Sequence, residues 1–204
     1  MSSLTTIITQ NLKKIYINGA TGRLGSLIYK NSISYLPTNS VLIDVSSPLG
    51  LKELLTSEHT PMIPLVIGTT GDLPMKEIEE FSKHVPVTIC PNFSKGVPLL
   101  GEICELIGRD KDWDIEITEV HHPAKKDMPS GTAKKLCDVL GVQYEKAHCL
   151  RMKDVIGEHT VHLACKGERI EIKHIATNRE IFALGALRVA DWTTEQQKGQ
   201  IYML

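Results

Sequence analysis

The side chains best suited to chemistry lie in one segment of this sequence, residues 120–133. The adjacent His121 and His122 are followed by Lys125 and by the turn Ser130-Gly131-Thr132. Histidine gives and takes a proton near neutral pH, and lysine supplies a positive charge. The turn leads into a helix-favouring run, whose free backbone N–H groups and dipole would attract an anion. The segment therefore predicts a site that moves a proton beside a bound carboxylate or phosphate of a small acidic substrate.

Each part of this segment also has a structural explanation. A His-His pair can be a solvated strand end, and Ser-Gly-Thr is a common helix cap. Zinc is a poorer alternative for His121 and His122, because neighbours on an extended segment point to opposite sides and would not share a metal. The chain also contains no Cys-x-x-Cys pair. We therefore expect acid–base chemistry here and no metal.

Composition narrows the class of protein. The chain has 204 residues, enough for one large or two small domains, with 23 basic and 24 acidic residues. This balance does not favour a nucleic-acid partner. The five scattered cysteines are typical of reduced thiols, and neither a signal peptide nor a membrane-spanning run is recognisable. We expect a soluble, cytoplasmic protein.

A glycine-rich turn stands near the N-terminus. The short strand 13–18 runs into Gly19-Ala-Thr-Gly-Arg-Leu-Gly25 and then into a helical stretch, 26–30. Strand, glycine turn and helix in this order are typical of a dinucleotide site, where backbone N–H groups meet a pyrophosphate. The spacing Gly-x-x-Gly-x-x-Gly is equally compatible with a plain strand-to-helix turn. Arg23 favours the nucleotide, since its cation could meet a cofactor phosphate.

The sequence then alternates between strands and helices, which predicts an α/β doubly wound domain. The expected strands are 41–44, 65–67 and 87–90, and the expected helices between them are 49–57 and 75–84. In such sheets ligands bind at the carboxyl ends of the strands, so the turns that follow should converge. One of these turns, Gly68-Thr69-Thr70-Gly71, could equally be an ordinary turn.

The pattern changes after residue 97 to that of an α+β domain. A helix over 98–107 precedes an alternating strand, 114–120, which delivers the chain to His121. After the helix 133–140, two further strands are expected to form a hairpin, 160–165 and 169–176. A last amphipathic helix covers 181–192.

These pieces together resemble the bacterial dihydrodipicolinate reductase family, over nearly the whole chain from Ile15 to Trp192. The most specific part is the run His-His-x-x-Lys-x-Asp-x-Pro-Ser-Gly-Thr-Ala at 121–133. Other matching pieces follow the family's order: Gly19–Gly25, Ile43-Asp44, Val66–Gly71, Asn92–Ser94, Gly157–Thr160 and Gly167–His174.

The resemblance implies a reaction and a role for each matching residue. The reaction is NAD(P)H-dependent reduction of 4-hydroxy-tetrahydrodipicolinate to tetrahydrodipicolinate, on the diaminopimelate route to lysine. His121 would be the general acid–base group and Lys125 a proton donor. The substrate carboxylates would be held by His122, Ser130, Gly131 and Thr132. The nicotinamide cofactor, NADH or NADPH, would be lined by three turns: Gly19, Ala20, Thr21, Gly22, Arg23 and Leu24; Gly68, Thr69 and Thr70; and Cys90, Pro91, Asn92 and Phe93.

The resemblance also implies how the chain is divided. Residues 1–93 and 178–204 would form a shortened Rossmann-like dinucleotide-binding domain. Residues 94–177 would form an inserted α+β domain with a mixed sheet, which binds the substrate and builds a homotetramer.

The chain departs from the family pattern between Lys30 and Val41. Relatives carry a second strand and further elements there, including the groups that grip the adenosine ribose or its phosphate, whereas this chain has only a short gap. Asp44 has the spacing of a ribose-binding acid. However, its surroundings align better with a later family strand, and Ser47 stands where relatives often have arginine. We therefore expect Asp44 not to meet the ribose, and little preference between NADH and NADPH.

Two other functions fit parts of this sequence. A shortened nucleotide domain could belong to a metabolite- or nucleotide-binding regulatory protein without turnover. A related nicotinamide dehydrogenase acting on another small amino or imino acid would share the first half of the fold. Neither would require the combination of His121, Lys125 and the Ser-Gly-Thr turn.

Overall fold

The computed structural model describes residues 4–8, 13–35, 37–107 and 112–204, and it consists of two compact units. The first unit comprises Met1–Phe93 and Glu180–Leu204, and the second comprises Ser94–Arg179. The chain thus leaves the first unit after Phe93 and returns at Glu180, where the sequence suggested 178. Among the described residues, no helix is both long and apolar enough to cross a bilayer.

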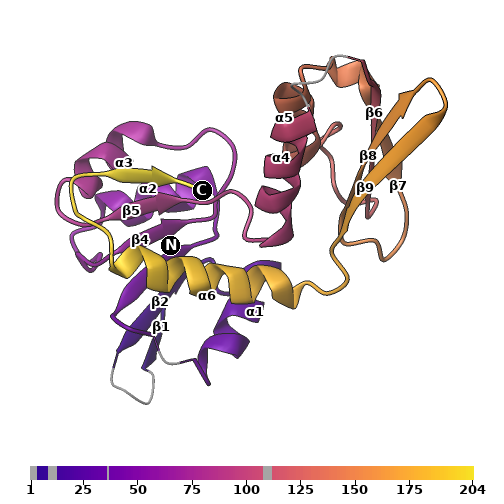
Figure 1. The fold of residues 1–204 in the computed structure, drawn as a ribbon. Coiled ribbons are helices and arrows are strands. Elements are labelled where there is room, and N and C mark those ends of the chain that lie inside the picture. The colour runs from indigo at the N-terminus through magenta and orange to yellow at the C-terminus, as the bar shows by residue number, and fades with distance from the viewer. Residues whose placement is uncertain (1–3, 9–12, 36, 108–111) are drawn as a thin grey trace. The chain divides into compact units, whose positions relative to one another are not determined.

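The first unit contains a six-stranded sheet in the order β1-β2-β3-β4-β5-β10 (Figure 1). Its strands are β1 (Thr5–Ile8), β2 (Lys14–Asn18), β3 (Val41–Asp44), β4 (Leu65–Ile67), β5 (Val87–Ile89) and β10 (Ile201–Met203). All neighbours are parallel except β1, which pairs antiparallel with β2. Because β3, β4 and β5 are buried on both faces, their apolar runs are continuous rather than alternating.

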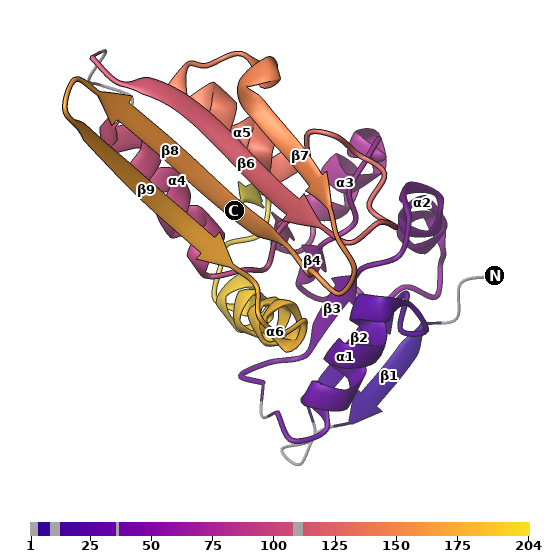
Figure 2. The same ribbon diagram turned by 90° about the vertical axis from the view of Figure 1, so that its right-hand side faces the viewer.

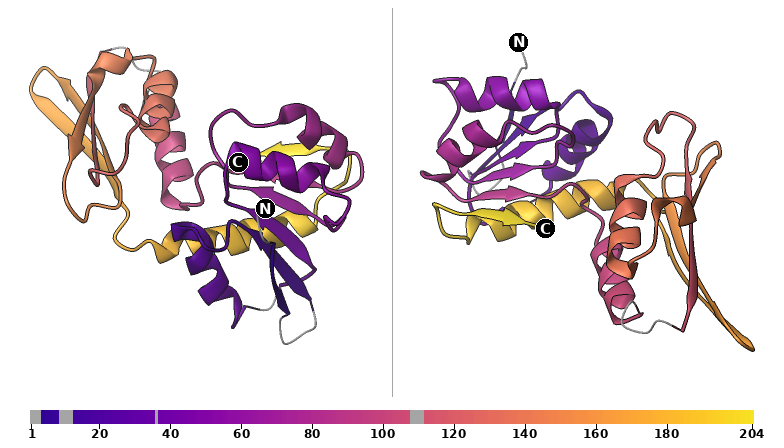
Figure 3. Two further views of the ribbon diagram at one scale, coloured as in Figure 1. Left: turned by 180° about the vertical axis from the view of Figure 1, so that it is seen from behind. Right: turned by 90° about the horizontal axis from the view of Figure 1, so that it is seen from above.

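Helices cover both faces of this sheet (Figure 3). On one face, α1 (Arg23–Ser32) and α6 (Glu180–Thr194) pack over residues that include Ile15, Ile17 and Val66. On the other face, α2 (Pro48–Thr56) and α3 (Met75–Ser82) pack over Leu65 and Ile67. The expected doubly wound arrangement is confirmed.

The connection through α1 has the opposite hand to those through α2 and α3. Strands β2, β3, β4 and β5 follow one another across the sheet in one direction, yet α1 lies on the other face from α2 and α3. Such crossovers are right-handed in the great majority of proteins. The connections through α2 and α3 are therefore the right-handed ones, and the connection through α1 is left-handed. This topology would result from losing strands after α1, where the sequence is short.

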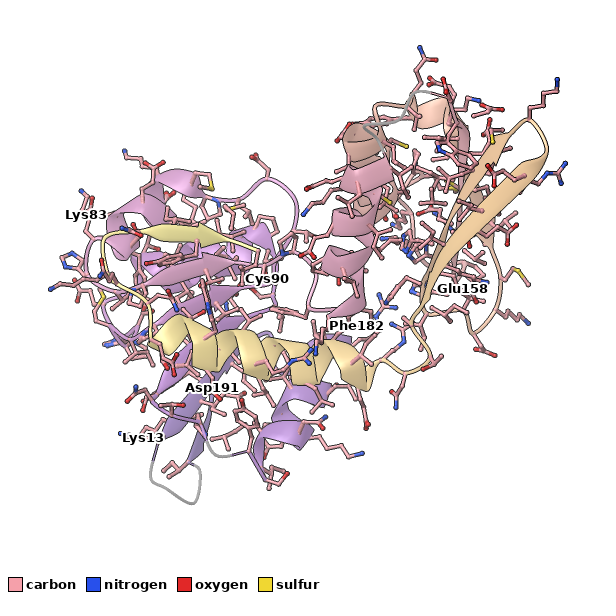
Figure 4. All side chains as sticks on the ribbon, viewed as in Figure 1. Lys13, Lys83, Cys90, Glu158, Phe182 and Asp191 are labelled. Atoms are coloured by element: carbon pink, nitrogen blue, oxygen red, sulfur yellow. The ribbon has the colours of Figure 1, made fainter. Side chains whose placement is uncertain are left out.

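The short segment between α1 and β3 is fastened to α6. The hydroxyl of Tyr35 and the backbone N–H of Thr38 both donate to the carboxylate of Asp191, which is labelled on α6 in Figure 4. The Tyr35 hydroxyl lies 2.5 Å from Asp191 Oδ2. Burial and this carboxylate raise the pKa of Tyr35 strongly, so the phenol stays protonated and keeps donating. The segment is thus tied to the core without further strands.

The second unit is a four-stranded mixed sheet with helices on one face. Its strands lie in the order β7-β6-β8-β9 (Figure 2): β7 (Ala147–Arg151), β6 (Asp114–His121), β8 (Glu158–Cys165) and β9 (Glu168–Ile175). Strand β7 is parallel to β6, and the other pairs are antiparallel. Helices α4 (Gly96–Ile107) and α5 (Gly131–Leu140) enclose an apolar core with Ile115, Ile117 and Val161. A one-turn helix, η1 (Tyr144–Lys146), precedes β7.

The expected fold class is therefore confirmed, with three strands that sequence reasoning missed. The helices and strands predicted from the sequence are all present, with ends shifted by a few residues. The missed strands β1, β7 and β10 are short, and each lies at an edge of its sheet. Edge strands bury little apolar surface, so their sequences show weak periodicity.

Candidate active site

Burial alternates along β6 and places the His121 side chain on the buried face of the second unit's sheet. Along this strand Ile115, Ile117, Glu119 and His121 are buried, and the residues between them are more exposed. Strand β6 ends at His121, and the next residue, His122, is partly exposed.

A buried polar cluster forms around Glu119. Its carboxylate is fully buried, and it lies opposite His159 in the β6–β8 register. Glu119 Oε2 accepts the backbone N–H of Ser130 at 3.1 Å and lies 3.6 Å from His121 Nδ1 and 3.8 Å from His159 Nε2. The His121 and His159 rings meet edge to face at 5.1 Å between centroids. One carboxylate therefore draws both imidazoles and the start of the Ser-Gly-Thr turn together.

The loop that carries Lys125 is clamped by Arg151, the last residue of β7. Arg151 Nε donates to the carbonyl of Lys125 at 3.2 Å, and Nη2 donates to the carbonyl of Asp127 at 2.7 Å. The same Nη2 donates to Glu119 Oε1 at 3.0 Å. Lys125 Nζ pairs with Asp127 Oδ1 at 3.0 Å, and its side chain is about a quarter exposed (27%). The ammonium is therefore held near the cluster but can reach a ligand.

The Ser-Gly-Thr turn begins α5 as expected. Ser130 is the N-cap, and its Oγ accepts the backbone N–H of Ala133 at 3.3 Å and shares a hydrogen bond with His159 Nε2 at 3.2 Å. Ser130 is buried, whereas Gly131 is exposed and Thr132 partly exposed. Helix N-termini attract anions, and the less buried residues of this turn are Thr132 and Gly131, whose backbone N–H already bonds to the Asp127 carboxylate.

Burial keeps both clustered histidines neutral near pH 7. It lowers the pKa of His121 to about 4, against the opposing pull of the Glu119 carboxylate. It also lowers the pKa of His159 to about 4, assisted by the neighbouring His121. Burial alone would raise the pKa of Glu119, but hydrogen bonds from Ser130, Cys149 and Arg151 hold it below its ordinary range. The cluster thus contains one carboxylate and two neutral imidazoles.

The same three residues could in principle hold a metal ion. Glu119, His121 and His159 each offer a ligand atom, and these atoms lie within 4.8 Å of one another. This set differs from the His121–His122 pair considered from the sequence. However, the Arg151 guanidinium already neutralises the carboxylate, and a second cation would be repelled by it and by Lys125. The contacts favour an acid–base role.

We predict that the second unit loses stability as pH falls from about 6.5 to about 4, the window between the unfolded and folded pKa values of His121 and His159. Within it the unfolded chain binds more protons than the folded one, so protonation favours unfolding. Each histidine should lower the free energy of unfolding by up to about 1.4 kcal/mol per pH unit. Urea unfolding at pH 7, 6 and 5 measures this slope.

The variant His159→Gln supplies the control for this slope. With this imidazole removed, the loss per pH unit should become smaller but should not vanish, because burial also lowers the pKa values of His121 and His174 in the same unit. A free energy of unfolding that stays constant between pH 7 and pH 5 in the unmodified protein would contradict neutral, buried imidazoles.

In the first unit, the glycine turn packs tightly between β2 and α1. Gly19 has a positive φ of 85°, and a Cβ there would lie 2.8 Å from the carbonyl oxygen of Val45. A Cβ on Gly25 would lie 2.1 Å from the carbonyl oxygen of Gly19, so only glycine allows α1 to approach the turn this closely. The N-cap of α1 is Gly22, and no side chain caps this end. The backbone there is accessible to an anion, with Thr21 and Arg23 exposed and Ala20 and Leu24 partly buried.

Asp44 joins the ends of three neighbouring strands. Its buried carboxylate accepts hydrogen bonds from Asn18 Nδ2 at 2.7 Å, Ser46 Oγ at 2.6 Å and Thr69 Oγ1 at 2.5 Å. Burial raises its pKa, and these hydrogen bonds oppose the rise. The carboxylate is therefore engaged within the protein, in keeping with its omission from the predicted cofactor set. Ser47, in place of the family's arginine, accepts a hydrogen bond from the Gly50 backbone N–H at the start of α2.

The other expected cofactor turns differ in how accessible they are. Thr69 is buried by its bond to Asp44, whereas Thr70 is exposed. A Cβ on Gly68 would lie 2.5 Å from the ring of Phe93, so that ring covers the glycine. Cys90 and Phe93 both belong to the apolar core beneath α6, where Figure 4 labels Cys90 and Phe182. Pro91 and Asn92 are the more exposed residues of that turn.

Sequence reasoning missed Glu119 and Arg151. Glu119 could have been found from the alternation of the strand, because Ile115, Ile117, Glu119 and His121 occupy every second position and therefore share the buried face. Arg151 gave no such signal, because it lies on a short edge strand more than twenty residues from the loop that it clamps.

Comparisons with known proteins point in one direction for both units. Residues 27–93 match the family model described as dihydrodipicolinate reductase, N-terminus. Residues 96–204 match the model described as dihydrodipicolinate reductase, C-terminus. The glycine turn at 19–25 precedes the matched range, so its assignment depends on its own geometry.

Similar curated proteins are described as 4-hydroxy-tetrahydrodipicolinate reductase. The chain is 40% identical to that of Aquifex aeolicus, over 80% of this chain and 71% of the relative. It is 41% identical to that of Thermosipho africanus, over 85% and 81%. It is 30% identical to that of Archaeoglobus fulgidus over 251 aligned positions, covering 94% and 98%. That alignment is longer than this chain of 204 residues, so the relative carries residues absent here.

A solved structure shares the fold across both units. It is the dipicolinate-bound dihydrodipicolinate reductase from Paenisporosarcina sp. TG-14, with a TM-score of 0.70, 17% identity and 97% of each chain covered.

Proposed function

The chain belongs to the dihydrodipicolinate reductase family, and from this premise we propose how its residues carry out the family's reaction. It is an oxidoreductase of lysine and diaminopimelate biosynthesis, a 4-hydroxy-tetrahydrodipicolinate reductase by its relationship to curated enzymes. The family uses a nicotinamide cofactor. We propose that this protein takes NADH or NADPH in the cytoplasm and forms tetrahydrodipicolinate.

The observation that carries the proposal is the arrangement around His121. Lys125, His121 and the Ser130 turn are drawn to one end of the second unit's sheet by Glu119 and Arg151. Such an arrangement provides proton exchange, a cation and an anion-binding helix start together. These are the groups that reduction of a cyclic dicarboxylate requires.

Substrate binding is assigned to the accessible groups of this arrangement. The backbone N–H groups at Gly131 and Thr132, with the side chains of His122 and Thr132, would hold the two carboxylates. Buried Ser130 supports the turn through its cap on α5 and its bond to His159.

Proton transfer is assigned to Lys125 and His121. Once the 4-hydroxyl and a neighbouring ring hydrogen have left the substrate as water, a conjugated cyclic imine remains, and a nicotinamide, when bound, would supply a hydride to its C4. The electron pair displaced by the hydride leaves negative charge on the ring, and a proton must neutralise it. The Lys125 ammonium stabilises that charge and donates a proton, and the neutral imidazole of His121 exchanges protons beside it.

The nucleotide is assigned to the glycine turn of the first unit. The close approach of Gly19 and Gly25 leaves backbone N–H groups at the start of α1 accessible to a pyrophosphate. Arg23, Thr70, Pro91 and Asn92 are exposed or partly exposed beside these turns. Cys90 and Phe93 would support the site from the core, since their side chains are buried.

We also propose that the second unit builds the homotetramer. Helices cover one face of its sheet, and the other face carries exposed apolar side chains, among them Leu150 and Ile175 at 48% exposure each. A second copy of the chain would bury this face (Figure 2). The mass of the purified protein in solution tests this part of the proposal.

A reductase assay with both cofactors tests the function. With the product of dihydrodipicolinate synthase as substrate, we expect nicotinamide absorbance to fall with either NADH or NADPH, with kcat/KM values within about tenfold of each other. We expect both cofactors to be accepted for two reasons. The Asp44 carboxylate is hydrogen-bonded within the protein, and Ser47 stands where an arginine could bind the phosphate of NADPH. A flat trace with both cofactors would identify a binding protein, and a preference above about a hundredfold would contradict the tolerance.

A further inference from the structure

Glu119 has a role that the assigned catalytic groups do not explain. A fully buried carboxylate is costly unless its charge is used, because burial removes its hydration even when a partner is present. The surrounding elements all give Glu119 partners: Cys149 and Arg151 on β7, His159 on β8, and Ser130 at the start of α5. On its own strand it faces His121.

The geometry determines which nitrogen of His121 faces the carboxylate. His121 Nδ1 lies 3.6 Å from Glu119 Oε2, and among the described residues no hydrogen bond to it is formed. A neutral imidazole carries one proton, and a carboxylate at this distance attracts it to Nδ1. The remaining nitrogen, Nε2, then has a lone pair.

The space beside Nε2 is kept open by a glycine. A Cβ on Gly157 would lie 3.1 Å from His121 Nε2 and 3.3 Å from Cδ2. Any side chain there would crowd the nitrogen that the carboxylate leaves free. The two nitrogens of the ring therefore have different surroundings: the Glu119 carboxylate lies beside Nδ1, and the missing side chain of Gly157 leaves space beside Nε2.

We propose that Glu119 is a positioning residue that fixes His121 as its Nδ1–H tautomer, so that Nε2 is the atom that exchanges the proton. The carboxylate also stabilises the imidazolium whenever Nε2 takes up a proton, as a carboxylate beside the far nitrogen does for other functional histidines. This inference rests on the proposed catalytic role of His121. The other charged or titratable groups that face the ring are His159, Lys125, Asp127 and Arg151.

The variant Glu119→Gln tests the proposal with little change of shape. An amide oxygen in the place of Oε2 can still accept the Ser130 N–H, but it carries no negative charge to hold the proton on Nδ1, so the opposite tautomer becomes more populated. We expect kcat to fall by about a hundredfold or more, with KM for the substrate changing by less than about threefold. The pKa of His121 in the pH profile should move lower, because the charge that raises it is gone.

Glu116→Gln is the matched control. Glu116 lies on the same strand but on the opposite face, and it pairs with Lys146 and His148 at the surface. The same change of charge there should leave kcat and the pH profile as in the unmodified protein.

Nitrogen NMR of His121 separates this proposal from the proposed function. We expect the unmodified protein to show protonated Nδ1, and Glu119→Gln to show a larger fraction of protonated Nε2. Protonated Nε2 in the unmodified protein would overturn the proposal, and this measurement stands even if the variant does not fold. If the tautomer of His121 changes in Glu119→Gln but kcat does not, Glu119 still positions the ring. That result would instead show that His121 takes no part in catalysis.

Discussion

Replacing Lys125 by alanine should lower kcat by about a hundredfold or more while leaving nucleotide affinity nearly unchanged. Lys125 supplies the ammonium of the site, and the clamp of Arg151 on its carbonyl keeps it beside His121. Without it, charge developing on the reduced ring loses its nearest proton donor. The nucleotide is assigned to the other unit, so its binding should not depend on this residue.

Two measurements and one control make this prediction specific. Steady-state assays give kcat, and fluorescence titration gives the dissociation constant of the nucleotide. The control is Lys126→Ala, which removes an equal charge from the exposed neighbouring residue and should keep kcat within about threefold of the unmodified value. Near-normal turnover in Lys125→Ala would remove Lys125 from the mechanism.

The parts of the fold that were predictable are those in which burial dictates the pattern. Strands such as Val41–Asp44 and Leu65–Ile67 are buried on both faces, so continuous apolar runs mark them. Helices α2 and α5 have serine N-caps, Ser47 and Ser130, which mark their first turns. The edge strand β7 carries no such pattern, and it supplies Arg151.

The site could be predicted only in part, because its chemistry depends on sheet register. His121 and Lys125 lie within one segment, so their proximity could be inferred from the sequence. The meeting of Glu119 with His159 depends instead on the pairing of β6 with β8, across forty residues of chain. Local patterns do not fix such a register. The reversed hand of the α1 connection was equally hidden, since it appears only when both faces of the sheet are known.

Replacing Arg151 by methionine should destabilise the second unit by about 3–5 kcal/mol. The aliphatic stem is kept, but the buried Glu119 carboxylate loses its guanidinium, and the carbonyls of Lys125 and Asp127 lose a donor. The Arg151 side chain is only 13% exposed, so water cannot readily replace these contacts. Removing one partner of a buried pair costs far more than the pair contributes.

The two tryptophans allow this loss to be measured in the correct unit. Trp113 packs against the core of the second unit, and Trp192 lies on α6 of the first. In a Trp192→Phe background, the fluorescence of Trp113 during urea unfolding reports on the second unit alone. Arg169→Met, an exposed arginine on β9, is the control and should change the free energy of unfolding by less than about 0.5 kcal/mol.

The double variant Glu119→Gln with Arg151→Met distinguishes loss of charge balance from loss of packing. If the cost of Arg151→Met comes from an unpaired buried carboxylate, removing that charge should recover about half of it, a coupling of about 2 kcal/mol. Additive losses would mean that Arg151 acts mainly through the two loop carbonyls. A loss below about 1 kcal/mol in Arg151→Met would show that the clamp does not stabilise the unit, and the loop of Lys125 would need another anchor.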